Sequence, residues 1–597
     1  MIKERIDALR RLMKEWGWDV AVTVGEDPHN SEYTPLRWCQ RQFISGFTGS
    51  AGVVVVTMDH AGLWTDSRYW IQAARELEGS GVELHKASLS DDSEWMEWIA
   101  SAVPAGGKVG IDGLCMSMNE ADLLQKAVKG KNCSVVSRPD YLECLWPDRP
   151  SLPDDRVWLH DDAYAGRSRS GKLEWLRGEI ELKGCRYMFL NRLDEIAWLL
   201  NIRSCDVDYC PFVISFAFIG PDSVTLFAEK SKFGSDVIHA LEKDNVRLMP
   251  YSGCGPFIGS FKPDGKILID AGSLNYEMCS SIRSSFGVDN TVSAGSVIGV
   301  AKAVKNSIET EGFRKAYIQD GIVQTRFFMW LETEMAAGHR ITESDASDRL
   351  HELRAAMPGF LDESFETISA YGANAALPHY STVRGKDALL EPHGLYLNDS
   401  GAHYRYGTTD ITRTVPLGPL TDLEREDYTL VMKGMIDLAM TVFPAGTPGS
   451  RLDAIARRPL WQTMRNYGHG TGHGVGNVLS VHEGPQNFRQ DRNVQPFLPG
   501  MITSDEPGIY REGLHGIRHE NMILCVPAGE NEFGEWLKFE TLTRTYFDTA
   551  PLVTEFMERR EIEWLNNFNH TVFETISPFL NAEERTWLNG KCAAIII

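Results

Sequence analysis

The chain has 597 residues, so we expect three to four domains rather than one. Acidic residues outnumber basic ones by 82 to 60, and the formal net charge of -22 argues against nucleic-acid phosphates or an anionic membrane as the main partner. Hydrophobic residues make up 43% of the chain, an ordinary share for a globular protein that buries real cores.

The N-terminal segment is predicted to be an amphipathic helix rather than a signal peptide. Charges recur throughout it, while Ile6, Leu9, Leu12 and Met13 fall at helical spacing. No run approaches the roughly 18 consecutive apolar residues that a membrane span requires, so we expect no membrane association. The 11 cysteines are scattered, odd in number and without a CxxC pair. We interpret them as reduced thiols of a cytoplasmic protein.

Composition and periodicity divide the chain into three predicted parts. Residues 1–155 alternate strand-like VAVTV and GVVVVT with helix-like QAARELE, which indicates an α/β domain. Residues 138–155 hold four prolines and five acidic residues, which is typical of a linker. Residues 156–310 repeat a similar order of elements, although no repeat is evident in the sequence itself. The pattern changes again from about residue 311, so the third part covers residues 311–597.

This third part opens with a long helical pattern and ends with another. Phe328, Leu331 and Met335 fall at helical spacing near its start. Near its end, one apolar stripe consists of Leu565, Phe568, Val572 and Ile576, which predicts a helix that covers a core or a dimer contact. Eleven of the 16 histidines lie between His339 and His570, so this part was searched for a site.

Two aspartates stand in strand-like runs at residues 396–414, YLNDSGAHYRYGTTDITRT. Asp399 alternates with leucines on one run, and Asp410 alternates with threonines on a second run. Between them lies a polar segment with two glycines that can turn the chain. We expect an antiparallel pair with both carboxylates on one side. Two such carboxylates repel each other unless they share a proton or bind a cation.

Three histidines lie among six glycines in YGHGTGHGVGNVLSVHEGP, residues 467–485. They are His469, His473 and His482. Glycine allows a backbone to pass close to a ligand or to adopt positive φ. A lone histidine is more often structural than a ligand, but three in such a setting favour a site. Another histidine, His379, follows a proline in ALPHYST.

Two glutamates complete the candidate set. Glu506 shares a strand face with Ile502 and Ser504, and Glu520 shares one with Met522 and Leu524. Any one carboxylate in the set could be a surface charge, a salt bridge or a helix cap. A glutamate that alternates with core residues is costly to bury unpaired. Four converging carboxylates would be unstable without a cation, and two divalent metals neutralise them.

The motifs that carry these residues resemble those of the pita-bread metallopeptidases. These motifs are YLNDSGAHYRYGTTDITRT, GHGTGHGVG with VHEGP, SDEPG and GIRHEN. Within that family the chain is similar to the long, three-domain cytosolic Xaa-Pro aminopeptidases. SGFTGSAG at 45–52, LWTDSRYWIQA at 63–73, LDEIAWLLNIR at 193–203 and residues 298–309 extend the resemblance over essentially the whole chain.

The resemblance implies a multidomain α+β and α/β fold with two creatinase-like N-terminal α/β domains, followed by a C-terminal pita-bread catalytic domain. It also implies the ligand set. Asp399 would bind one metal, Asp410 and Glu520 would bridge both, and His473 and Glu506 would complete the other metal. The metals would be Mn²⁺, with Co²⁺ or Zn²⁺ as alternatives.

The remaining histidines and one arginine receive substrate roles from the resemblance. His379 and His482 would line the substrate site close to the scissile carbonyl, and Glu506 would also move the proton. His469 would be a neighbour of the site. Arg68 would reach the peptide across a homodimer, although a surface salt bridge competes with this interpretation. His519 departs from the family pattern, which has an aliphatic residue there, and should point to the opposite strand face.

The implied activity is removal of an N-terminal residue that precedes proline, through attack of a metal-bridging hydroxide on the Xaa-Pro bond. Its substrates would be peptides with proline at the second position. One alternative is a prolidase, which has the same ligand set but cuts only dipeptides; the extra middle domain favours the aminopeptidase. A second alternative is a non-catalytic pita-bread module that binds peptides or protein partners, which would be expected to lack ligands.

Overall fold

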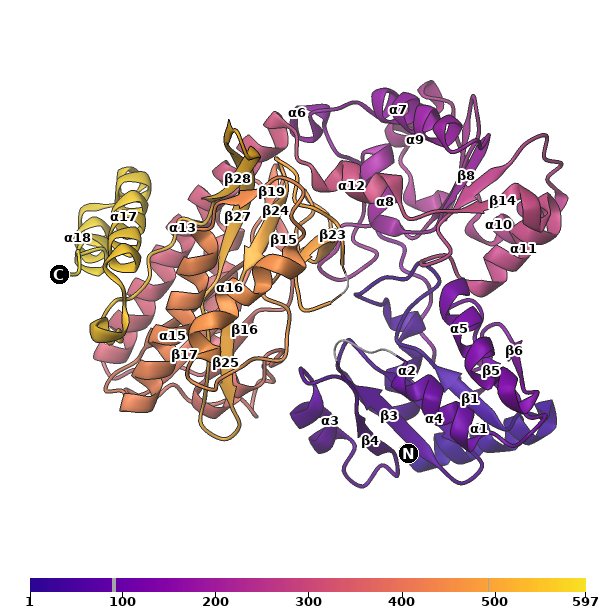
Figure 1. Cartoon of the computed structure of the whole chain (residues 1–597), viewed down its shortest axis with the longest axis horizontal. Helices are drawn as coiled ribbons and strands as arrows, with labels where there is room; N and C mark the ends of the chain where they lie inside the picture. Colours follow the sequence, from indigo (N-terminus) through magenta and orange to yellow (C-terminus); the bar gives the residue numbers. More distant parts are fainter. Residues whose placement is uncertain (89–92, 492, 597) are drawn as a thin grey trace. The chain divides into compact units, whose positions relative to one another are not determined.

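The computed structural model describes residues 1–88, 93–491 and 493–596 (Figure 1). The chain forms two compact units. The first consists of Met1–Asp162 and Arg167–Ile298, and the second of Ala163–Gly166 and Gly299–Ile597. Among the described residues, no helix is both long and apolar enough to cross a membrane. The domain boundaries expected near residues 155 and 310 stay predictions.

The first unit contains two six-stranded sheets. The strands of the first sheet are β1 (Val20–Thr23), β2 (Val53–Thr57), β3 (Ala61–Thr65), β4 (Glu83–Lys86), β5 (Lys108–Ile111) and β6 (Ser134–Ser137). Those of the second are β8 (Tyr187–Leu190), β10 (Phe216–Ile219), β11 (Val224–Phe227), β12 (Val246–Met249), β13 (Ile267–Ile269) and β14 (Thr291–Ser293). Their orders are β4-β3-β2-β1-β5-β6 and β12-β11-β10-β8-β13-β14.

The two sheets share one topology. In each, a central strand pairs antiparallel with one neighbour and parallel with the other, as β1 does with β2 and β5, and β8 with β10 and β13. The outermost strands of both sheets add in parallel. The fold of this unit is therefore repeated even though no repeat is evident in the sequence.

Helices cover these sheets. They are α1 (Ile2–Trp16), α2 (Gln40–Ser45), α3 (Trp70–Glu76), α4 (Glu94–Ala102), α5 (Met118–Val128), α7 (Arg169–Leu182), α8 (Leu193–Leu200), α9 (Ser235–Lys243), α10 (Cys254–Ser260) and α11 (Tyr276–Phe286). The predicted stripe of α1 buries Ile6, Leu9 and Met13 against the first sheet. Residues 138–155 contain the short η3 (Glu143–Leu145) and otherwise irregular chain, in which Tyr141 and Leu142 are buried in the core of the first sheet.

The second unit contains three sheets around the candidate residues. One is β15 (Phe360–Glu363), β18 (Ala402–Tyr404) and β19 (Gly407–Thr408), and another is β16 (Ile368–Tyr371), β17 (Leu395–Ser400) and β20 (Ile411–Pro416). The third has the order β21-β28-β27-β24-β22-β23. Its strands are β21 (Phe443–Pro444), β22 (Gly472–Gly474), β23 (Glu483–Phe488), β24 (Ile502–Asp505), β27 (Asn521–Asn531) and β28 (Gly534–Thr541). The hairpin of β25 (Gly508–Arg511) and β26 (His515–Arg518) is separate.

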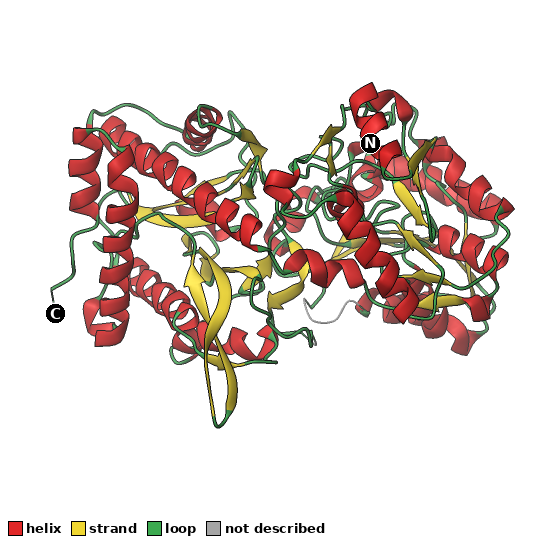
Figure 2. Cartoon of the chain, turned by 90° about the horizontal axis from the view of Figure 1, so that it is seen from above, coloured by secondary structure: helices red, strands yellow, loops and turns green. Residues whose placement is uncertain are grey.

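Long helices pack on these sheets (Figure 2). They are α13 (Ser307–Ala336), α14 (Glu343–Ala355), α15 (Asp422–Ala439), α16 (Gly449–Trp461), α17 (Arg559–Ile576) and α18 (Ala582–Lys591). Asn306 and Glu309 form a capping box that begins α13. The predicted stripe of α17 is confirmed, because its four residues are buried in the same core cluster as Phe328 and Leu331 of α13.

The strands that carry the two aspartates pair as predicted, but the chain between them does more than turn. β17 and β20 are antiparallel, with Asp399 opposite Thr412. The intervening residues form β18 and β19, a short hairpin that joins β15 in another sheet. Alternation alone could not reveal this hairpin because its strands have only three and two residues.

Candidate metal centre

All five predicted ligands lie in or next to strand ends of the second unit. Asp399 is in β17 and His473 is in β22, while Asp410 directly precedes β20, Glu506 directly follows β24, and Glu520 directly precedes β27. Asp399, Asp410 and Glu520 are buried, and His473 and Glu506 are half-buried. Two sheets therefore direct these side chains toward one place, although Asp399 and Glu520 are 121 residues apart in the sequence.

The potential ligand atoms of these residues converge. They form overlapping groups within which every ligand atom lies within 4.8 Å of the others: Asp399, Asp410 and Glu520; His473, Glu506 and Glu520; and Asp410, His473 and His482. His473 Nε2 lies 3.3 Å from Glu506 Oε1 and 3.5 Å from Asp410 Oδ2. Asp410, His473 and Glu520 each belong to two of these groups, so the three groups form one continuous cluster.

The electrostatics of this cluster fit divalent cations. Burial, reinforced by the charges of Asp399 and Glu506, raises the pKa of Asp410 well above its ordinary value. Burial and the nearby carboxylates raise the pKa of Glu520 in the same way. Asp399 Oδ1 and Glu520 Oε1 are buried oxygens without a hydrogen-bond partner. Buried, mutually repelling carboxylates with unsatisfied oxygens are what two bound cations would neutralise.

Side chains next to the ligands fix their positions. The Ser504 hydroxyl donates to Glu506 Oε1 at 3.0 Å and accepts from the backbone N–H of His473 at 2.9 Å. Thr412 donates to Glu520 Oε2 at 2.8 Å. At Gly472, a Cβ atom would collide with the backbone oxygen of Ser504. Glycine at this position therefore allows the close approach of two strands, whereas the sequence predicted close approach to a ligand or positive φ.

Arg518 is a site residue that sequence reasoning missed. Its guanidinium forms an ion pair with Asp399, and its Nε donates to Asp399 Oδ2 at 3.2 Å. It also donates to Tyr510 Oη at 2.6 Å. A signal was present in the sequence, because Arg518 and Glu520 are two residues apart in GIRHEN and alternation places such residues on one side of the chain.

The structure places two further histidines beside the cluster. The His482 ring lies perpendicular to that of His473, with centroids 4.4 Å apart, so His482 is close enough to be a sixth ligand candidate. His469 shares a hydrogen bond of 2.8 Å with Tyr510 Oη, the same hydroxyl that accepts from Arg518. His469 is therefore a neighbour of the cluster through Tyr510. The substrate roles of both histidines stay predictions.

The other two predicted substrate residues lie outside the ligand groups. His379 follows η7 (Gly372–Ala376) in a turn whose preceding residue, Pro378, accepts a hydrogen bond of 3.4 Å from Arg518. Arg68 belongs to the first unit, where it forms an ion pair of 2.8 Å with Asp66. That pair is the competing interpretation of Arg68 from the sequence, and its role in peptide binding stays a prediction.

His519, the departure from the family pattern, is fully buried away from the ligands. Its ring packs edge-on against Tyr428 of α15, with centroids 4.3 Å apart, and against Phe547 at 5.7 Å. Burial and the charge of Arg413 lower the pKa of His519 well below its usual value, so the ring is neutral. The expectation that His519 faces the packing behind the site is confirmed.

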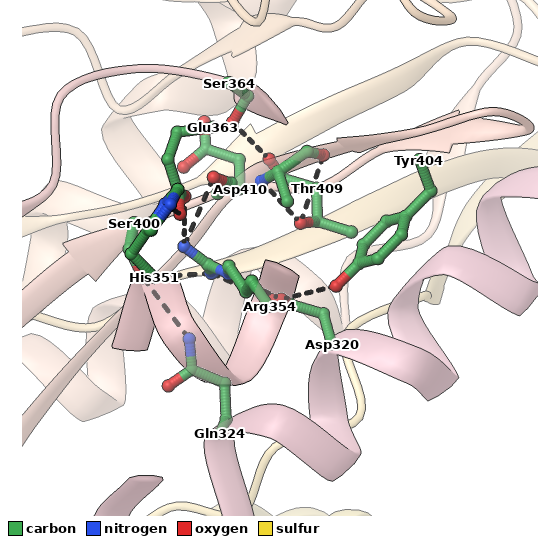
Figure 3. A network of polar contacts seen from close by, with 12 residues as sticks. Asp320, Gln324, His351, Arg354, Glu363, Ser364, Ser400, Tyr404, Thr409 and Asp410 are labelled. Atoms are coloured by element: carbon green, nitrogen blue, oxygen red, sulfur yellow. Dashed lines mark hydrogen bonds and ion pairs between the residues drawn. The ribbon is translucent and has the colours of Figure 1, made fainter. Parts of the chain in front are cut away.

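A buried ionic network lies beside the end of β17, the strand that carries Asp399 (Figure 3). Arg354 of α14 forms ion pairs of 2.9 Å with Asp320 of α13 and with Glu363 of β15. The same guanidinium donates to Ser400 Oγ at 3.1 Å and to the backbone oxygen of Gly401 at 3.2 Å. Because Ser400 directly follows Asp399, this network fixes the strand end from which Asp399 extends.

Comparison with known protein families assigns every part of this architecture. Models of the creatinase/prolidase N-terminal domain match residues 5–139 and 148–309. The model of metallopeptidase family M24 matches residues 311–527, and that of the C-terminal region of this family matches residues 535–595. The predicted fold class, two creatinase-like domains followed by a pita-bread catalytic domain, is thereby confirmed.

Individual relatives agree with the family models over the full chain. A probable Xaa-Pro aminopeptidase P of Tuber melanosporum is 38% identical, with 99% of each chain covered. Aminopeptidase P2 of Arabidopsis thaliana is 37% identical over 98% of this chain and 88% of its own length. The crystal structure of X-prolyl aminopeptidase from Caenorhabditis elegans, described as a cytosolic enzyme with a di-nuclear active site, is 31% identical and covers 100% of both chains with a TM-score of 0.95.

Identity above 30% over nearly the whole length of several relatives, on the same fold and with converging carboxylates in the same unit, leads to one conclusion. The chain is a metal-dependent peptidase that belongs to metallopeptidase family M24 and, within it, to the Xaa-Pro aminopeptidases.

Proposed function

We propose that this enzyme releases the N-terminal residue of peptides with proline at the second position, using two divalent cations. The observation that carries the proposal is the convergence of Asp399, Asp410, His473, Glu506 and Glu520, in a chain related over its whole length to Xaa-Pro aminopeptidases. The X–Pro bond is a tertiary amide without a donor N–H, and proline bends the chain. A dedicated site for this bond is therefore chemically reasonable.

The family resemblance assigns distinct roles to the ligands. Asp410 and Glu520 would contact both cations, and their ligand atoms form one group with that of Asp399. Asp399 would complete the first ion, and His473 and Glu506 would complete the second. Oxygen-rich ligation with one nitrogen suits Mn²⁺, and we propose Mn²⁺ as the native metal with Co²⁺ or Zn²⁺ as alternatives. Such a pair would activate the attacking water and polarise the scissile carbonyl.

The chain's own groups would manage the proton and the substrate. Glu506 would take a proton from the nucleophile and return it to the proline nitrogen. In the metal-free protein, burial raises the pKa of this carboxyl group to about 7. His482, whose ring lies beside that of His473, would donate a hydrogen bond to the developing oxyanion, and we assign His379 to the same side of the substrate. We keep Arg68 and His469 as residues that contact the substrate or its immediate surroundings.

The enzyme's setting is also part of the proposal. We propose a cytoplasmic homodimer with two creatinase-like domains, 1–155 and 156–310, and a catalytic domain of residues 311–597. Nine of the 11 cysteines, those outside residues 205–210, are free thiols, which agrees with a reducing compartment, and the relative from Caenorhabditis elegans is described as cytosolic. Light scattering of the purified protein tests the dimer.

The deciding experiment combines metal content with products. The protein is stripped with a chelator, reloaded with Mn²⁺, Co²⁺ or Zn²⁺, and assayed by mass spectrometry on Xaa-Pro-Xaa, Xaa-Ala-Xaa, Xaa-Pro and N-acetyl Xaa-Pro-Xaa peptides. We expect one cleavage, after the first residue, in the proline tripeptide and little turnover of the acetylated or alanine peptides. Turnover restricted to Xaa-Pro dipeptides would indicate a prolidase. No turnover with any metal would favour a binding module.

A further inference from the structure

Two histidines and a glutamate converge at one edge of the first sheet, in the N-terminal unit. His60 lies in the turn that joins β2 to β3, while Glu83 and His85 belong to the edge strand β4. One ring nitrogen of each histidine and one carboxylate oxygen of Glu83 lie within 4.8 Å of one another. Every other group of this kind among the described residues belongs to the candidate metal centre, so this cluster is separate from the proposed catalytic chemistry.

Local structure explains the convergence. Glu83 and His85 are two residues apart in β4 and so point to the same face. The Thr57 hydroxyl accepts a hydrogen bond of 3.0 Å from the backbone N–H of His60, which fixes the turn. Gly62 of β3 lies beneath both rings: a Cβ there would be 2.8 Å from His60 Nε2 and 2.8 Å from His85 Cδ2. Glycine at this position therefore leaves the space in which the two imidazoles meet.

The ring geometry matches that of metal ligands. His60 Nε2 and His85 Nε2 are 3.2 Å apart, and a carboxylate oxygen of Glu83 lies within 4.8 Å of one ring nitrogen of each histidine. Two nitrogens bound to one tetrahedral Zn²⁺ at about 2.0–2.1 Å would be separated by about 3.3 Å.

Tryptophans hold the two rings in place. Trp64 stacks on His85 with centroids 3.9 Å apart and an interplanar angle of 9°. Trp98 of α4 lies 4.8 Å from the ring of His60. An indole on each side restricts the imidazole orientations, which lowers the entropy lost when both bind one ion. The same tryptophans provide an optical reporter for an ion bound at this position.

We propose that His60, Glu83 and His85 form an additional divalent-cation site that takes a late first-row ion such as Zn²⁺. Two imidazoles and one carboxylate favour Zn²⁺, Ni²⁺ or Cu²⁺ over Mn²⁺ or Mg²⁺. Both histidines are half-buried and Glu83 is exposed, which leaves a coordination position for water. A bound ion would join the β2–β3 turn to the edge strand β4. This inference does not depend on the proposed peptidase mechanism.

The test counts ions per chain. The full-length protein is dialysed against buffered Zn²⁺ at neutral pH, and its zinc content is measured by mass spectrometry of the metal. We expect the variant carrying His60→Ala and His85→Ala to hold one ion fewer per chain than the wild type. The control is His239→Ala, which removes an exposed histidine of α9 in the same unit and should leave the content unchanged.

A second readout separates this site from the dinuclear centre. On Mn²⁺-loaded protein, Cu²⁺ should quench tryptophan fluorescence, because it would bind beside Trp64 and Trp98, and the quench should be largely lost in the single variants His60→Gln and His85→Gln. Mn²⁺-dependent cleavage of a proline tripeptide by these variants verifies that they fold. Equal zinc content in the wild type and the double variant would overturn the proposal. An unchanged Cu²⁺ quench in the single variants would overturn it as well, and the paired nitrogens would then be a histidine–histidine hydrogen bond only.

Discussion

Replacement of Arg354 by methionine should destabilise the catalytic unit and weaken its metal centre. The Arg354 side chain is 0% exposed and makes five hydrogen bonds: two to Asp320, and one each to Glu363, Ser400 and Gly401. Methionine nearly fills the volume but supplies no donor. The substitution therefore leaves two carboxylates in the interior without their shared cation.

The loss of Arg354 should destabilise the two carboxylates to different extents. Asp320 is 2% exposed and keeps only a hydrogen bond of 3.4 Å from Tyr404 Oη among its contacts in this network, whereas Glu363 is 11% exposed and keeps His351 at 3.1 Å. Removing one partner of a buried ion pair costs about 3–5 kcal/mol, because the other charge remains buried. For a unit of roughly 300 residues this corresponds to a fall in melting temperature of about 5–8 °C.

The assay compares double variants on metal-loaded protein by scanning calorimetry. Arg354→Met with Asp320→Asn should recover most of the lost melting temperature, and Arg354→Met with Glu363→Gln should recover less, because His351 already compensates Glu363. Metal content should fall in the single variant, since Ser400 is no longer fixed beside Asp399. A single variant with the wild-type melting temperature and metal content would refute this reasoning, as would equal recovery in both double variants.

Three further outcomes are expected of the metal centre. Asp410→Asn should lose at least one metal ion and most activity with the fold retained, while Asp422→Asn, at an exposed position of α15, should change neither. His473→Ala should lower metal occupancy, whereas His482→Ala should keep the metals and lower kcat; the reverse result would exchange their roles. Burial raises the pKa of Glu506 to about 7 in the folded, metal-free protein, whereas the unfolded value is near 4.3. At pH values between these two, the folded state binds more protons than the unfolded state. The metal-free protein should therefore lose stability as the pH rises from 5 to 7.5. Excess Mn²⁺ should abolish that pH dependence in thermal melts.

The ligand-bearing strand ends could be predicted because a strand with one buried face has apolar residues at alternate positions in the sequence. Asp399 alternates with leucines and Glu520 with Met522 and Leu524, so each carboxylate was expected on an inward face before any tertiary contact was known. The stripe of α17 was predictable for the same reason. These are properties of neighbouring residues, and a single sequence contains them in full.

Contacts between distant segments produce no such pattern in the sequence. Arg518 lies 119 residues from Asp399, and Arg354 reaches Ser400 across 46 residues. The chemistry of an arginine is the same on a surface and in a core, so its partner cannot be inferred from its neighbours. The shared topology of the two N-terminal sheets was also not evident, because a fold depends on the pattern of apolar burial and tolerates wide changes in the residues that provide it.

The five proposed ligands come from two sheets that share no strand, and this has a mechanical consequence. β17 and β20 supply Asp399 and Asp410, and the sheet containing β22, β24 and β27 supplies the other three. Electrostatic repulsion between the four carboxylates should therefore push the two sheets apart in the metal-free protein. Bound cations should draw the sheets together, because each cation attracts carboxylates from both. Between the two sheets, the backbone N–H of Glu520 donates to the Thr412 carbonyl at 3.2 Å. The rate of amide hydrogen exchange at Glu520 should therefore report separation of the two sheets, slow with cations bound and fast without them.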